Sequence, residues 1–241
     1  MSLLYDADGD KFVSTSAISA PTAGTTITWF YPTSDTARQT VYIYQGDGGS
    51  NGYADLVWRA DLAGDYFAAT RERGAGATQI LVQANAANYS VYGLNKWLCL
   101  VFRWDTAGAN SDQRLWMGDE TTAPAAPSSY TTQSAGSGAS STTAGVCTVG
   151  ASNVSTTRWL RGRVGFHALF STALSDADMN AVCAGVYWGS PTHWWLPGRN
   201  GTTDVPEIAG GNTGVITGLS SPDFAPGRYF VKPLAFMGVG G

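Results

Sequence analysis

The chain has 241 residues, of which 44% are hydrophobic and only 13% are charged. This apolar content supports a sizeable core and excludes a wholly disordered chain, and the shortage of charge excludes a coiled coil or a long solvated helical bundle. The net charge of −4, with its basic residues thinly spread, argues against nucleic acid or a membrane surface as a partner.

Short runs rich in β-branched and aromatic residues recur along the chain and are separated by turns rich in Gly and Asp. We expect strands at 11–16, 25–31, 39–45, 53–59, 66–71, 79–83, 97–104, 113–117, 148–151 and 161–170. The run 97–104 is the most apolar and should be covered on both faces, and the turn 62–65 should close a hairpin. This spacing predicts an all-β sandwich.

One helix is expected, beginning at Ser175 and ending by Gly185. The Ser175 hydroxyl can accept a hydrogen bond from a free amide of the first turn, and Asp176 and Asp178 favour the positive end of a helix. Met179 and Val182 are three residues apart, so both can face inward.

Residues 119–145 are rich in Thr, Ala, Pro, Ser and Gly, with Tyr130 as the one aromatic residue. We interpret them as a long loop of one domain, with an edge strand near Tyr130 and an interdomain linker as alternatives. Three cysteines, Cys99, Cys147 and Cys183, lie far apart, and the N-terminus lacks the pattern of a secretory signal. We therefore expect free buried thiols in a protein made in the cytoplasm of its host; a single bridge with one odd thiol is left open.

Six segments, in this order, resemble the laminin-G-like branch of the concanavalin A-like sandwich. They are Asp8–Val13, Thr26–Thr33, Trp97–Asp105, Arg114–Gly118, Thr148–Ala151, and Gly162–Gly165 together with Ala173–Asp178. The resemblance implies a two-sheet antiparallel jelly-roll sandwich with one short helix near 175–184. We assign residues 1–225 to it.

The segments Trp194–Gly198 and Glu207–Gly218 resemble the stretch that usually opens such a domain, although here they come last. We expect strands within 194–218 to complete the sandwich, since domain termini that lie close together tolerate circular permutation. The shifted order is similar to that of tailed-bacteriophage and prophage proteins, which implies a virion component.

Catalysis is not expected. Glycosidases of this fold resemble one another in an E-x-D-x-E strand, whose alternate carboxylates share one face. The three glutamates here, Glu72, Glu120 and Glu207, have no carboxylate two residues away. His167 should be a packed or surface residue of its strand.

Two kinds of binding site are considered. Asp6, Asp8 and Asp10 are interleaved oxygen donors that suit calcium, and the alternative is a solvated turn. Tyr53, Trp58 and Arg59 are the candidates for glycan binding, although core packing is the more common role of aromatic residues within strands.

The segment 226–241 is apolar and rich in Gly, and we expect it to dock on a partner or a sister subunit. Its apolar side chains include Tyr229, Phe230, Leu234, Phe236 and Met237. The sequence is thus interpreted as a non-enzymatic bacteriophage structural protein, a capsid decoration or tail component that contacts other virion proteins and adheres to host glycans. The alternative is a carbohydrate-binding lectin module, either with or without a dependence on calcium.

Overall fold

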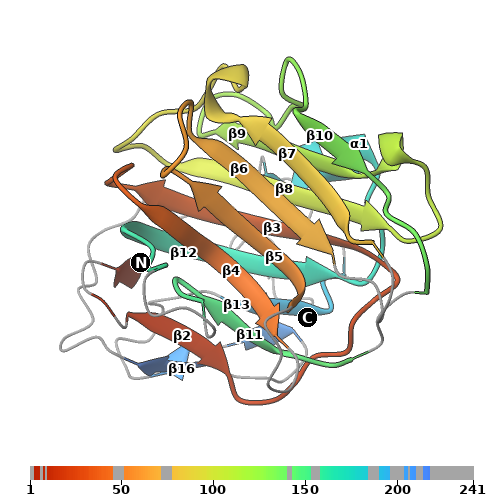
Figure 1. Ribbon diagram of the computed structural model, residues 1–241. Coiled ribbons are helices and arrows are strands. Elements are labelled where there is room, and N and C mark those ends of the chain that lie inside the picture. Colours follow the sequence, from red (N-terminus) through yellow and green to blue (C-terminus); the bar gives the residue numbers. More distant parts are fainter. Residues whose placement is uncertain are drawn as a thin grey trace, which may run out of the picture.

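The computed structural model describes residues 3–5, 8, 10–45, 52–71, 78–139, 143–152, 158–183, 190–195, 204–205, 207–209 and 214–217. Within this part of the chain the strands form two antiparallel sheets that face each other, with a short helix on the far side of one of them (Figure 1). No helix among these residues is both long and apolar enough to cross a membrane.

The seven-stranded sheet has the order β15-β13-β12-β3-β8-β9, with β1 paired to β12. Its strands are β1 (Leu3–Tyr5), β3 (Ala23–Pro32), β8 (Leu98–Asp105), β9 (Arg114–Asp119), β12 (Gly162–Phe170), β13 (His193–Trp195) and β15 (Glu207–Ala209). The central strands β3 and β8 are buried on both faces, as predicted for the run 97–104.

The nine-stranded sheet has the order β10-β7-β6-β5-β4-β11-β2-β16-β14. Its strands are β2 (Lys11–Ser14), β4 (Arg38–Gln45), β5 (Gly52–Arg59), β6 (Tyr66–Arg71), β7 (Ile80–Asn85), β10 (Thr132–Ser134), β11 (Val146–Val149), β14 (Asp204–Val205) and β16 (Gly214–Thr217). The predicted hairpin of β5 and β6 is confirmed, and its turn places Gly64 and Asp65 at positive φ. β10 is an edge strand that follows Tyr130 closely in the chain and pairs with β7.

The main core lies between the two sheets and is rich in aromatic side chains. Trp58 stacks on Phe67 with ring centroids 5.6 Å apart, and Trp195 is fully buried. A polar group sits in this core: His167 lies 2.7 Å from the Thr28 hydroxyl through Nδ1 and 2.8 Å from the Tyr44 hydroxyl through Nε2. The prediction that His167 is a packed residue is thereby confirmed.

A second apolar cluster lies beneath the helix α1 (Asp176–Cys183), on the outer face of the seven-stranded sheet. The helix begins as predicted, because the Ser175 hydroxyl accepts a hydrogen bond from the Asp178 amide at 3.1 Å. Met179 and Val182 are buried against Trp29 and neighbouring side chains, so the predicted inward face is also confirmed.

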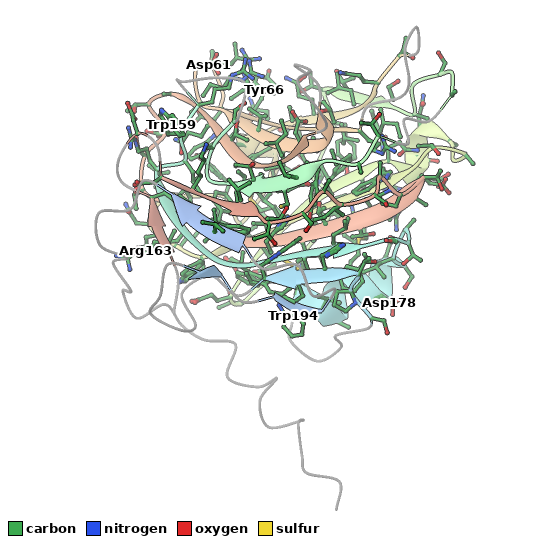
Figure 2. All side chains as sticks on the ribbon, turned by 90° about the horizontal axis from the view of Figure 1, so that it is seen from below. Asp61, Tyr66, Trp159, Arg163, Asp178 and Trp194 are labelled. Carbon is green, nitrogen blue, oxygen red and sulfur yellow. A yellow bond between two sulfur atoms is a disulfide. The ribbon has the colours of Figure 1, made fainter. Side chains whose placement is uncertain are left out.

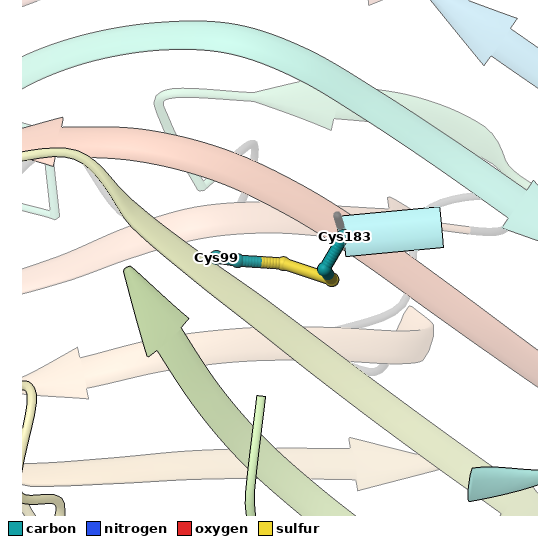
Figure 3. The surroundings of a disulfide bond; sticks show 2 residues. All are labelled: Cys99 and Cys183. Carbon is teal, nitrogen blue, oxygen red and sulfur yellow. A yellow bond between two sulfur atoms is a disulfide. The ribbon is translucent and has the colours of Figure 1, made fainter. Parts of the chain in front are cut away.

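A disulfide joins Cys99 of β8 to Cys183 of α1 (Figure 3). The expectation of three free thiols is therefore wrong, and the single bridge that the sequence left open is the one present. Cys147 is buried and takes no part in the disulfide. The bridge fastens the helix over the second cluster, whose other contacts with α1 are apolar side chains.

Candidate functional site

The two sheets present very different outer faces. The outer face of the seven-stranded sheet is occupied by α1, which lies over Trp29, Val101 and Phe166. The outer face of β4–β7 is on the opposite side of the molecule, and in the described part of the chain no helix packs on it. Figure 2 shows this separation: Asp61 and Tyr66 lie on one side, and Asp178 and Trp194 lie on the other.

Strand pairing aligns three rows of side chains on this surface, which we call the outer face. Side chains alternate along each strand, so residues in register share a face. The rows are Arg38, Arg59, Tyr66 and Asn85; then Thr40, Val57, Ala68 and Gln83; then Ile43, Asp55, Thr70 and Leu81. Thr40, Val57 and Ile43, on the β4 and β5 side of the face, are buried, whereas the other nine side chains of these rows are partly exposed.

Asp55 is the carboxylate within these rows. The Thr70 hydroxyl donates a hydrogen bond to it from the adjacent strand. Burial raises the pKa of Asp55 to about 6, although Thr70, Arg38 and Arg158 all act to lower it. Burial thus outweighs these interactions, and the carboxyl group holds its proton to a higher pH than an exposed aspartate does.

This pKa leads to a testable prediction about stability. Folded Asp55 retains its proton up to a higher pH than the unfolded chain, so ionisation through pH 4–6 destabilises the fold. Asp55→Asn should raise the free energy of unfolding at pH 8, and this gain should shrink as the pH falls towards 4. Denaturant titrations at both pH values measure it.

Asp61→Asn is the matched control, because the hydrogen bond from Arg59 lowers the pKa of Asp61. This substitution should reduce stability slightly at pH 8, in the opposite direction. Equal responses of the two variants would contradict the assignment of Asp55.

Three arginines gather at one corner of the outer face. Arg59 donates to both oxygens of Asp61, at 2.8 and 2.9 Å. Arg38 lies directly across the strands from Arg59. The backbone carbonyl of Arg158 accepts a hydrogen bond from the Thr40 amide at 3.3 Å, which holds that segment beside β4. Burial, then Arg158 and Arg59, lower the pKa of Arg38.

The candidates for glycan binding fall in different places. Trp58 is fully buried, because it is on the inner side of β5 and stacks on Phe67. It cannot be the exposed platform that the sequence suggested. Arg59 does lie on the outer face. The backbone of Tyr53 belongs to β5, but its side chain is outside the described residues.

Two of the three predicted calcium ligands, Asp8 and Asp10, lie in the described part of the chain. Asp8 is exposed and forms an ion pair with Arg161, whereas Asp10 is buried. Asp6 lies outside the described residues, and those described hold no group of three His, Cys, Asp or Glu side chains suited to a metal. Residues 226–241, including the proposed docking side chains, also lie outside the described part.

Sequence reasoning missed several residues of the outer face. Asp55 is one of them. It alternates with Ala54 and Leu56 along β5, just as Arg59, which was a candidate, follows the buried Trp58, and this period of two was the signal that one side of the strand is polar. Arg38 carried no such signal, because it is the first residue of β4 and is followed by two further polar residues, Gln39 and Thr40, so no alternation is visible there.

Solved structures of a pentraxin and of a protein described as carbohydrate-binding are similar to this chain over most of its length. A heptameric SAP-like pentraxin from Limulus polyphemus has a TM-score of 0.53 at 10% identity, over 89% of this chain and 93% of that one. A Bacteroides ovatus protein to which carbohydrate binding is attributed has 0.52 at 10% identity, over 92% of this chain and 61% of that one.

Mouse laminin α1 domains LG4–5 have a TM-score of 0.45 at 14% identity, over 72% of this chain and 44% of that one. No family model and no curated protein sequence matches the chain. These structures give no support to a virion origin. In fold, the chain is a two-sheet antiparallel jelly-roll sandwich.

Proposed function

We propose that the protein is a carbohydrate-binding domain whose glycan ligand lies across the outer face of β4–β7. The observation that carries the proposal is the surface itself. Along one edge of this face runs a row of partly exposed polar side chains that includes an aromatic ring, Tyr66. The helix covers the outer face of the other sheet, and it leaves the described part of this one uncovered.

The chemistry of this surface suits a sugar. A Tyr ring offers an apolar face for the C–H groups of a pyranose and a hydroxyl for hydrogen bonding. The amide of Gln83 provides both a donor and an acceptor, and sugar hydroxyls need both. The Asn85 Oδ1 already accepts a hydrogen bond from the Ala87 amide, so Asn85 offers its NH2 group as a donor. The lectin-like fold neighbours make the proposal more probable by analogy only.

The proposed function does not include catalysis. Hydrolysis of a glycosidic bond by the usual mechanism needs two carboxyl groups about 5–10 Å apart across the bond. The three rows contain one carboxylate, Asp55, and the Asp61 carboxylate beside them is held by Arg59. We therefore favour the lectin alternative over the interpretation as a virion component.

The test is a broad glycan panel, screened with the full chain in calcium and again in chelator. Binding should occur in both buffers. Tyr66→Ala should lower the affinity for the bound glycan about tenfold, which corresponds to about 1.4 kcal/mol of binding free energy. Tyr31→Ala is the matched control, because Tyr31 is a partly exposed tyrosine on β3 of the other sheet. Equal losses in both variants, or no bound glycan, would contradict the proposal.

A further inference from the structure

We propose that the corner formed by Arg38, Arg59 and Arg158 binds the acidic group of an anionic glycan, a carboxylate or a sulfate. This inference rests on the proposed function and specifies its ligand class. It is drawn from the charges around the corner, which the fold brings together from β4, β5 and the segment after β11.

Without a bound anion, the close arrangement of these arginines destabilises the sheet. Arg38 and Arg59 are direct cross-strand neighbours, whose Cβ atoms lie about 5 Å apart in such a pair, and like charges at this distance destabilise a sheet. Arg158 adds a third positive charge, and it disfavours the charged form of Arg38 even more than Arg59 does.

The carboxylates nearby neutralise this charge only in part. Asp61 engages Arg59 through two hydrogen bonds. Asp55 accepts a hydrogen bond from Thr70 and acts on Arg38 and Arg158 through space. Among these five groups, three guanidinium groups outnumber two carboxylates. Asp65, which precedes Tyr66, and Asp35, which acts on Asp65, are further carboxylates at this end of the sheet.

Arg38 has a hydrogen-bond donor that a ligand could satisfy. Its Nε atom is shielded from solvent and has no hydrogen-bond partner among the described residues. A desolvated charge is stabilised when it gains a hydrogen-bonded counterion. The planar guanidinium fork matches the oxygens of a carboxylate or a sulfate, which accept two parallel hydrogen bonds.

The register also suggests how the rest of the ligand lies. Tyr66 is the next residue in the row after Arg59, and Asn85 follows Tyr66. An acidic group at Arg38 would therefore place the sugar ring towards Tyr66, along the row and across the strands.

The experiment uses the full chain and matched probes: lactose against sialyllactose and sulfated lactose, galactan against polygalacturonate, and desulfated heparin against heparin. The acidic member of a pair should bind at least about tenfold more tightly, and 0.5 M NaCl should abolish most of that preference. The comparison of sialyllactose and polygalacturonate with the sulfated probes distinguishes carboxylate from sulfate.

The Arg38→Gln variant should lose the preference for acidic probes, whereas Arg163→Gln on β12 of the other sheet should keep it. Circular dichroism checks the fold of each variant, and Arg158→Gln replaces Arg38→Gln should the latter not fold. Equal binding of neutral and acidic probes would overturn this inference while leaving the proposed function intact. Binding to no glycan at all, in these pairs or in the broad panel, would overturn both.

Discussion

Removing the disulfide by Cys183→Ala should lower the free energy of unfolding by about 4 kcal/mol. The bridge connects residues 84 apart in sequence, so it restricts a long loop of the unfolded chain, and the entropy of closing such a loop gives this magnitude. The bridge also holds α1 over the second apolar cluster, so its loss should expose the α1 region first. Denaturant unfolding without reductant measures the change, and hydrogen exchange locates it.

Two comparisons make this prediction specific. Cys147→Ala keeps the bridge and removes one buried sulfur, so it should cost only about 1 kcal/mol. Wild-type protein in reductant should unfold at the same denaturant concentration as Cys183→Ala in reductant. A wild-type midpoint that reductant does not move would show that the bridge contributes nothing in solution.

His167→Leu should destabilise the fold by about 3–5 kcal/mol, although leucine is apolar and of similar size. His167 is fully buried and lies within hydrogen-bonding distance of both Thr28 and Tyr44, which come from the two opposing sheets. Leucine would remove a hydrogen-bond partner from both hydroxyl groups inside the core, and each buried polar group that loses its partner costs about 1–3 kcal/mol. Unfolding in denaturant at pH 7.5 measures the loss.

A double-mutant cycle separates this interaction from packing. Tyr44→Phe alone should cost about 1–2 kcal/mol, and His167→Leu with Tyr44→Phe should cost less than the sum of the two. Strict additivity would mean that the hydrogen bond between them contributes no coupling.

The same histidine should determine part of the acid sensitivity. Burial, followed by the charge of His193, lowers the pKa of His167 to about 3. The unfolded chain therefore binds this proton below pH 6.5 while the folded chain does not, so stability falls as the pH drops from 6.5 towards 3. His167→Gln should flatten this slope, which reaches about 1.4 kcal/mol per pH unit. The opposite contribution of Asp55 is common to both proteins and cancels in the comparison.

The strands were predictable where a run of β-branched and aromatic residues ended at a turn residue, as in β3 before its last residue, Pro32. The helix start was predictable because capping depends on a few adjacent residues, Ser175 to Asp178. β1 was missed, since a strand of three residues carries too little pattern to stand out from a loop.

Which side of β4 belongs to the outer face could not be predicted, because the strand is apolar at every position from Val41 to Tyr44. The structure resolves this with a bulge between Thr40 and Tyr42, which shifts the alternation of side chains along the strand. The cysteine pairing was equally inaccessible, since only the fold brings β8 under α1. The corner of three arginines depends on a segment after β11 that returns to β4, and neither composition nor spacing reveals that contact.

The placement of β2 has a consequence for how the molecule is made. This strand lies between β11 and β16, whose residues come far later in the chain (Figure 1). A nascent chain therefore carries β2 with both edges open until those partners leave the ribosome, and pairing at such sequence distance is slow. During that interval the open edges invite pairing with other chains. Lys11, the one charged residue of β2, would be a weak safeguard, so yield in expression should depend on chaperones and on low temperature.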